Sequence, residues 1–273
     1  MSERKEEPEM DPNEVPEVVP EKIKSPFDYK AIIGIAILVI SFHVITNYFV
    51  DPDSSDLIVS IFSFINPLIV AIIGFYVASR YGKSQVFGKA NLALAGGFLS
   101  IFLAEVTYML YDIVYNIEPY PSIADVFFFM LYPLLLVYLF LNIKFFIPKL
   151  SKKAKVWIAI MPLIVLLGYS ILSTTEGEIS IFEFDFYYGV IFVYIVTLTL
   201  AVAVVGAINL KEGVIGKAWI VLVSGILLLT MGDIWYYNLE LFEGYDLTHP
   251  VNMFWYAGYW GITYALIKHK KII

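Results

Sequence analysis

Two segments of the chain repeat the pattern acid-x-x-Tyr-x-x-x-acid inside long apolar stretches. At 3.6 residues per turn, offsets of three and seven place all members of such a trio on one face of a helix. A charged carboxylate deep in hydrocarbon costs about 2.5 kcal/mol or more, so these faces should turn toward a bundle interior or a water cavity. The candidates for holding a proton, an ion or another ligand are Glu105, Tyr108 and Asp112, and then Asp233, Tyr236 and Glu240.

The two deeper acids, Glu105 and Asp233, lack an evident cationic partner. Lys144 lies at the end of its apolar stretch, which leaves His43 as the only basic candidate, although it also fits a buried histidine of the core. Glu105 and Asp233 are then expected to be protonated, to bind a cation or to contact water. The alternative is structural, with each protonated acid hydrogen-bonded to a nearby tyrosine or threonine.

Three other acids, Asp112, Asp125 and Glu240, lie nearer the ends of their apolar stretches and are expected to be solvated at the membrane interface. Asp112 and Glu240 follow the deeper acids by seven residues, which is about 10 Å along a helix. One outer loop also holds oxygen and imidazole ligands of the kinds that bind a divalent cation. These loop candidates are Glu240, Glu243, Asp246 and His249.

The composition places these residues in a membrane protein. The 273 residues are 59% hydrophobic and 16% charged, with a mean hydropathy of +0.76, and a soluble domain is less apolar and more charged. Cysteine is absent, which excludes disulfides, thiolate metal sites and cysteine nucleophiles.

Eight stretches have the roughly 20 apolar residues that a helix needs to cross a bilayer. The sequence therefore predicts an all-α integral membrane protein with about eight transmembrane helices. The predicted spans are Ala31–Val50, Leu57–Ser79, Leu92–Tyr115, Val126–Ile147, Val156–Thr174, Tyr187–Leu210, Ala218–Tyr237 and Val251–Ile267.

Lysine and arginine fall only in alternate connections, whereas the other connections carry acids and no bases. Cytoplasmic loops retain basic residues, so the pattern predicts that both termini are cytoplasmic in a multi-pass protein of the cell membrane. The basic positions are Lys22, Lys24, Lys30, Arg80, Lys83, Lys89, Lys149, Lys152, Lys153, Lys155, Lys211, Lys217, Lys268, Lys270 and Lys271.

The chain also contains an internal repeat. Residues 97–142 align with residues 225–268 at a shift of about 128, which pairs Glu105 with Asp233 and Asp125 with Asn252. Four helices per half is an even number, so the two halves should be parallel in the membrane. The predicted organisation is a disordered acidic tail (1–30), a first four-helix repeat (31–147), a basic loop (148–155), a second repeat (156–268) and a short tail (269–273).

The stretch PYPSIADVFFFMLYP, residues 119–133, resembles the multi-helix membrane input domains found ahead of bacterial diguanylate cyclases and some histidine kinases. In that group a Gly-Asp-x-x-Tyr helix end precedes Pro-Ser-x-Ala-Asp and a Tyr-Pro helix. The second half keeps Gly-Asp-Ile-Trp-Tyr at 232–236 but has Asn252 in place of the aspartate. The resemblance implies a sensory role without naming a ligand. Because only two residues follow Lys271, it also implies a separate cytoplasmic signalling partner.

Three functional interpretations follow. A sensory or receptor-like module that binds a small ligand or ion is favoured, and a proton- or cation-coupled transporter of a small solute is the alternative. The third is an intramembrane hydrolase, since Tyr111-Asp112 and Gly232-Asp233 resemble the paired motifs of intramembrane aspartyl proteases, where two carboxylates share a proton. Thr230 departs from that motif and Asp112 lies about two turns shallower than Asp233, which argues against an enzyme.

The histidines argue against a zinc enzyme too, because His43, His249 and His269 fall at different levels or sides. We predict no cofactor and no nucleic-acid partner, and the lipid bilayer as the surrounding medium.

Overall fold

The structure, a computed structural model, describes residues 28–82, 84, 86–175, 179–210, 216–242 and 244–268. Helices and their connecting turns account for all of these residues, which confirms the predicted all-α class. The helices are α1 (Tyr29–Tyr48), α2 (Pro52–Tyr81), α3 (Phe87–Met109), which continues into a π-helical turn (Leu110–Val114), α4 (Ile123–Phe146), α5 (Lys152–Thr175), α6 (Phe184–Leu210), α7 (Gly216–Phe242) and α8 (Val251–Lys268).

Seven of these helices, α1 to α7, are long and apolar enough to cross a membrane. The eighth predicted span, α8, falls outside this set because its 18 residues include Asn252 and several tyrosines, tryptophans and glycines. Its position explains that composition. Ile267 is the only exposed side chain of α8, so the helix needs little of the hydrocarbon surface that a lipid-facing helix presents.

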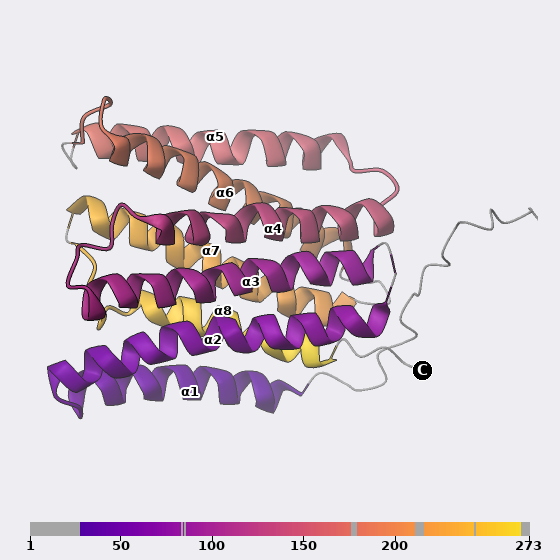
Figure 1. Cartoon of the computed structure of the whole chain (residues 1–273). Coiled ribbons are helices and arrows are strands. Elements are labelled where there is room, and N and C mark those ends of the chain that lie inside the picture. The colour runs from indigo at the N-terminus through magenta and orange to yellow at the C-terminus, as the bar shows by residue number, and fades with distance from the viewer. Residues whose placement is uncertain are drawn as a thin grey trace, which may run out of the picture.

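Hydrogen bonds at both ends of α8 show that it covers the same depth as α1. The Asp28 backbone N–H donates to the Tyr264 hydroxyl at 3.0 Å near one end, and Asn47 Nδ2 donates to the Thr248 carbonyl at 2.7 Å near the other. The described chain therefore enters and leaves the bundle at the same end (Figure 1).

Six helices form a closed ring, in which each packs on the next in the order α2, α3, α4, α6, α7, α8 and back to α2. The other two lie outside it: α1 packs on α8 and α2, and α5 packs on α6. Figure 1 shows α1 and α5 at opposite margins of the bundle. In this order α3 and α7, the helices that carry the paired acids, stand on opposite sides of the ring.

Local capping explains where the helices begin. Asp28 accepts a hydrogen bond from the Lys30 N–H, so α1 starts at Tyr29, two residues before the predicted span. The rest of the predicted tail, like residues 269–273, lies outside the described residues. Asp51 caps α2 ahead of Pro52, where proline is favoured because that first N–H has no helical partner.

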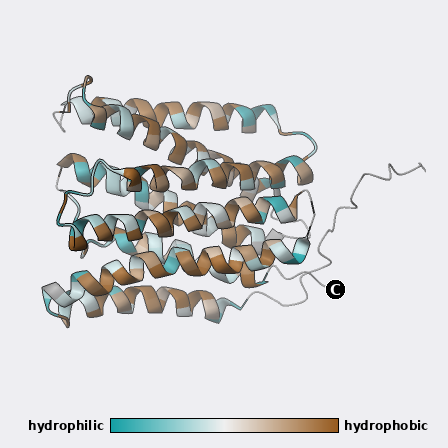
Figure 2. Ribbon diagram, in the orientation of Figure 1, coloured by the Kyte–Doolittle hydropathy of each residue, from teal (hydrophilic) through white to brown (hydrophobic). Residues whose placement is uncertain are grey.

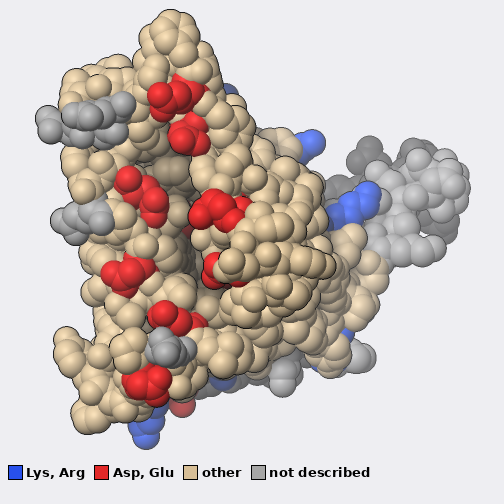
Figure 3. All heavy atoms as spheres, turned by 60° about the vertical axis from the view of Figure 1, so that its left-hand side comes forward, with Lys and Arg blue, Asp and Glu red and all other residues tan. Residues whose placement is uncertain are grey.

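The two ends of the bundle differ in charge. Hydrophobic residues cover the lengths of the helices and hydrophilic ones gather at their ends (Figure 2). Acidic side chains surround a recess at the end that holds the α1–α2, α3–α4, α5–α6 and α7–α8 connections, while lysines and arginines lie toward the other end (Figure 3). We call these the acidic end and the basic end. The alternation read from the sequence thus becomes a physical separation of charge.

The ring interior is packed tightly in its basic half. Phe98 of α3 meets Tyr259 of α8 edge-on, with ring centroids 5.9 Å apart. Tyr138 of α4 stacks on Trp219 of α7 at 5.5 Å. These aromatic pairs close the interior together with side chains that are at most 1% exposed, among them Leu94, Leu135, Leu139, Leu222 and Ile226.

Candidate functional site

Glu105, on the inner side of α3, lies among tyrosines from other parts of the bundle. Its side chain is half-buried and is close enough to interact electrostatically with Tyr245, Tyr256 and Tyr259 as well as with Tyr108 of its own helix. Because α8 is not a ring neighbour of α3, Glu105 must point across the interior.

No hydrogen bond or ion pair to Glu105 is formed by any described residue. Thr107, a candidate partner from the sequence, donates instead to the Leu103 carbonyl of its own helix at 2.6 Å. Glu105 is therefore a half-buried carboxyl group without a fixed partner.

Asp233, on α7, is held more firmly. Its Oδ1 accepts a hydrogen bond from Trp255 Nε1 of α8 at 3.0 Å. Gly232 makes this contact possible, since a Cβ at that position would lie 2.7 Å from Nε1 and 2.8 Å from Cδ1 of Trp255. The missing side chain lets the indole lie directly against α7, beside the carboxylate.

Aromatic rings surround this anchored acid. Tyr236 and Tyr245 have ring centroids 5.3 Å apart, and Trp255 lies 5.9 Å from Tyr236 and 6.0 Å from Tyr245. Burial raises the pKa of the Tyr245 hydroxyl well above its ordinary value, and the nearby Tyr256 and Glu105 add to this effect. Tyr245 thus stays a neutral donor beside Glu105.

Tyr259 connects the two acids. It is close enough to interact electrostatically with both Glu105 and Asp233, and its ring meets Phe98 in the packed basic half. Glu105 and Asp233, 128 residues apart in the chain, therefore lie near the same tyrosine at the acidic side of that packed region. We call Glu105, Tyr236, Asp233, Trp255 and Tyr259 the acid–tyrosine chamber.

Asp112 lies on the π-helical turn that ends α3. The Tyr115 N–H donates to the Leu110 carbonyl at 3.0 Å, five residues back, so the helix is wider here than the α-helical spacing assumed from the sequence. Asp112 is exposed and interacts electrostatically with Tyr108. No interaction between Asp112 and Asp233 occurs among the described residues, so the carboxylate pair of an aspartyl protease is not formed.

Asp125 serves α4 as a capping residue. Its Oδ2 accepts a hydrogen bond from the Ser122 N–H at 2.6 Å, while Ser122 Oγ accepts one from the Ala124 N–H at 3.1 Å. This reciprocal capping box satisfies donors that a helix N-terminus leaves free. A helix-capping role accounts for Asp125 without a ligand.

Glu240 and Asn252 organise the α7–α8 connection. Glu240 Oε1 accepts a hydrogen bond from the Tyr245 N–H at 3.2 Å, and Asn252 Oδ1 accepts one from the Tyr245 hydroxyl at 2.9 Å. Gly244 supplies the positive φ of 73° that the end of α7 requires. These bonds fix Tyr245 above the chamber.

His43 lies apart from the acids, on the peripheral helix α1. Its Nε2 is 3.2 Å from Asn47 Nδ2, and the ionisable side chain near it is His249. It is therefore not the cationic partner of Glu105 or Asp233.

The outer-loop residues proposed for a divalent cation have other partners. Asp246 accepts from the Thr248 N–H at 2.7 Å, and His249 Nδ1 accepts from the Val251 N–H at 3.1 Å. Glu243 lies outside the described residues. Within the described part of the chain, no three His, Asp or Glu side chains are placed to hold a metal ion.

Two contributors to this end of the molecule were missed from the sequence. The Tyr120 hydroxyl donates to Asp185 at 2.7 Å, which joins the α3–α4 connection to α6. Burial and this hydrogen bond raise the pKa of Tyr120. Tyr245 was also missed, because a single loop tyrosine gives no periodic signal.

No protein-family model matches the chain, and neither a curated protein nor a solved structure is detectably similar to it.

Proposed function

We propose that this chain is a receptor-like sensory module that binds a small cation or protonated amine in the acid–tyrosine chamber. One observation carries the proposal: Glu105 and Asp233, from opposite helices of the ring, both lie near enough to Tyr259 to interact with it electrostatically, and no described residue supplies a compensating positive charge. A cation would interact with both carboxylates and with the faces of the surrounding aromatic rings.

The packed basic half favours binding over passage. Phe98, Tyr138 and Trp219 fill the interior on the basic side of the chamber, and Phe98 packs there against Tyr259. The recess lies at the acidic end (Figure 3). A ligand would therefore enter and leave from the acidic side. The bound charge would interact with side chains of α3, α7 and α8 at once. A ligand that binds one arrangement of these helices more tightly than another shifts the bundle toward that arrangement.

We further propose that the protein lies in the cell membrane with all eight helices crossing it and the basic end in the cytoplasm. Retention of basic residues in cytoplasmic loops supports this orientation. The equal depth of α1 and α8 supports the eighth crossing. The ring order, in which α2, α3 and α4 are followed by α6, α7 and α8, supports two four-helix repeats. In this orientation the signal would pass to a separate cytoplasmic partner.

The test is a ligand titration of the protein in nanodiscs, with Na⁺, tetramethylammonium and spermidine as probes. Trp255 fluorescence and the infrared carboxyl stretch report on the two acids. We expect a saturable change that is lost in Glu105→Gln and in Asp233→Asn but kept in Asp56→Asn, an exposed acid at the same end. Equal responses in all three variants would refute the chamber as the site.

Proton- or cation-coupled transport is the second candidate, and the partnerless Glu105 favours it. A carboxyl group without a fixed partner can bind and release a proton as the surrounding helices move. Flux of a solute into liposomes that depends on a proton or sodium gradient would support transport. A protein with Glu105→Gln that carries the solute at the same rate at every pH would exclude a coupled mechanism through this residue.

A further inference from the structure

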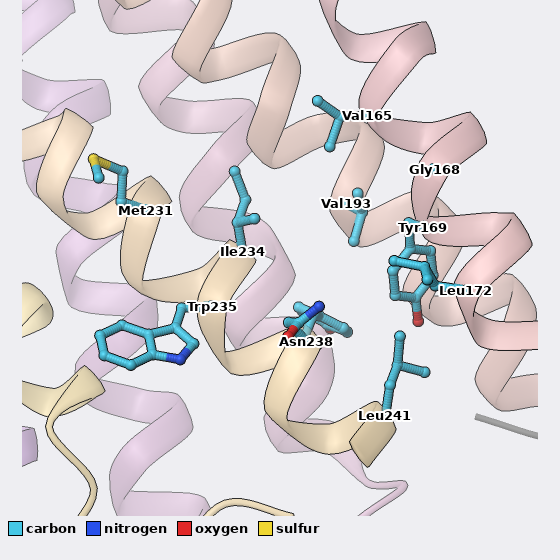
Figure 4. A pocket seen from close by; sticks show the side chains of 11 residues that line it. Val165, Gly168, Tyr169, Leu172, Val193, Met231, Ile234, Trp235, Asn238 and Leu241 are labelled. Carbon is cyan, nitrogen blue, oxygen red and sulfur yellow. The ribbon is translucent and has the colours of Figure 1, made fainter. Parts of the chain in front are cut away.

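A cavity lies outside the ring, between the peripheral helix α5 and α7, with α6 behind it (Figure 4). It has a volume of about 530 Å³ and lies in the half of both helices nearest the acidic end. Its lining is almost wholly apolar. The lining includes Val165, Leu172, Met231, Trp235, Asn238 and Leu241, together with the backbone at Gly168.

The cavity opens away from the ring. Leu172, Met231 and Trp235, which line it, are 39%, 50% and 37% exposed. Helix α5 packs mainly on α6 and meets α7 where the Tyr169 and Tyr237 rings lie edge-on, 6.1 Å apart. Nothing lies within 4 Å of a Cβ placed on Gly168. In a membrane this opening faces the hydrocarbon of the bilayer.

The dimensions decide what can occupy the cavity. Its lining on α7 runs from Met231 to Leu241, ten residues or about 15 Å of helix. Dividing about 530 Å³ by this length gives a mean cross-section of about 35 Å². A single hydrocarbon chain, which is much thinner than a helix about 10 Å wide, fits a space of this length and cross-section.

Asn238 carries the only amide among the lining residues, whose other polar groups are the hydroxyls of Tyr169 and Tyr237 and the indole N–H of Trp235. Asn238 points from α7 into the space between α7 and α5 (Figure 4), is exposed and forms no hydrogen bond with any described residue. It lies four residues from the end of the span Trp219–Phe242, about 6 Å along the helix. That depth is where the polar oxygens of a lipid begin.

We infer that this cavity is a lipid-binding site: it takes one hydrocarbon chain of a membrane lipid along the α5–α7 groove, and Asn238 donates a hydrogen bond to an oxygen of that lipid near the interface. The lipid fills the gap between α5 and α7 and adds to the packing by which α6 already holds α5 to the ring. The site is separate from the acid–tyrosine chamber, and its existence does not depend on the proposed function.

The test compares Gly168→Leu with Gly34→Leu. Both glycines are exposed and helical, and a Cβ added at either would have no neighbour within 4 Å, but only Gly168 lines the groove. Each full-length protein is equilibrated in nanodiscs of phosphatidylcholine that contain a trace of the same lipid with a diazirine in its chain. Native mass spectrometry then counts retained lipid, and peptide mapping after illumination locates the label.

We expect one retained lipid for the unsubstituted protein and for Gly34→Leu, with label on α5 and α7. Leucine at position 168 displaces about two methylene groups of the chain, which lowers retention about tenfold. Asn238→Leu should lower it roughly two- to tenfold through loss of one hydrogen bond.

Leu172→Trp, at an exposed position of the same lining, is a second blocking variant should Gly168→Leu fail to fold. Equal retention in the blocked and control variants would overturn the inference. A change from dimer to monomer in the blocked variants would also overturn it, because the groove would then be an interface between copies.

Discussion

The two acid-bearing corners of the ring hold equivalent carboxylates in different ways. Asp233 is fixed by Trp255 across the close approach at Gly232, and the connection after it is fastened through Tyr245. Glu105 has no such bond, and its helix ends in a π-helical turn. One acid is thus part of the packing, whereas the other is free to respond. A repeated motif can therefore yield one structural and one responsive group.

Of the substitutions that test this difference, Gly232→Val should lower the free energy of unfolding the most. A side chain would push against the Trp255 ring, 2.7–2.8 Å away, and overpacking of this kind costs about 3 kcal/mol of unfolding free energy. Denaturant unfolding followed by tryptophan fluorescence measures it. Gly34→Val, where nothing is within 4 Å, controls for helix propensity, and equal losses in the two variants would mean that the Asp233 corner is not tightly packed.

Trp255→Phe should come next, with a loss of about 2 kcal/mol, because it leaves Asp233 without its hydrogen-bond donor. Trp235→Phe is the matched control, since Trp235 forms no hydrogen bond with any described residue. The same unfolding measurement, read by circular dichroism, applies to both. A cost no greater than that of the control would show that the Trp255–Asp233 bond does not anchor this corner.

Ser122→Ala tests the corner that holds Glu105. There, a capping box at the start of α4 takes the place of a hydrogen bond to the acid. Loss of the Ser122 hydroxyl from the capping box should cost about 1 kcal/mol. Ser41→Ala, at an exposed position within α1, measures the effect of the substitution without a cap. If the two serines are equivalent in thermal unfolding, the start of α4 is held by tertiary contacts instead.

Glu105→Gln should change the unfolding free energy by less than about 0.5 kcal/mol, as expected for a group with no partner to lose. This small effect contrasts with that of Trp255→Phe. A loss above about 1 kcal/mol would reveal that Glu105 does have a structural partner.

The smallest effect concerns pH at the acidic end. The Ser54 N–H, which donates to Asp51 Oδ1 at 3.0 Å, lowers the pKa of this exposed carboxyl group. The bond therefore stabilises the fold above the unfolded pKa of about 3.9, and this contribution is lost as pH falls through the lower folded value. Asp51→Ser caps without titrating. The difference in unfolding midpoint between the unsubstituted protein and Asp51→Ser should shrink below pH 4. A difference that stays constant with pH would contradict a stabilising role for the Ser54–Asp51 hydrogen bond.

Hydropathy and charge in the sequence were enough to predict the helices and the two ends. Each described helix begins within five residues of its predicted span, because a run of about 20 apolar residues has few alternatives in a bilayer. Helix α8 differs from the other seven, because it is less apolar than a helix that faces lipid. Enclosure by other helices lets it use polar aromatic residues, and enclosure cannot be read from hydropathy alone.

Residue spacing also placed Glu105 and Asp233 at equivalent positions on their helices. It could not say that Trp255 binds one of them while no described residue binds the other, since partners come from α8 and depend on how closely helices approach. It also assigned Asp125 to the interface without seeing its capping role, and assumed an α-helical face for Asp112 where the helix widens. The local backbone geometry determines both the capping role of Asp125 and the position of Asp112.

The sequence by itself determined a helical membrane chain, its acidic and basic ends and two matched acids, because those properties depend on local composition and on helical periodicity. The tertiary structure alone decided the ring order, the convergence of both acids on Tyr259 and the groove between α5 and α7. These depend on which helix faces meet, and in a membrane that choice follows from side-chain shape, because every apolar face is equally compatible with lipid.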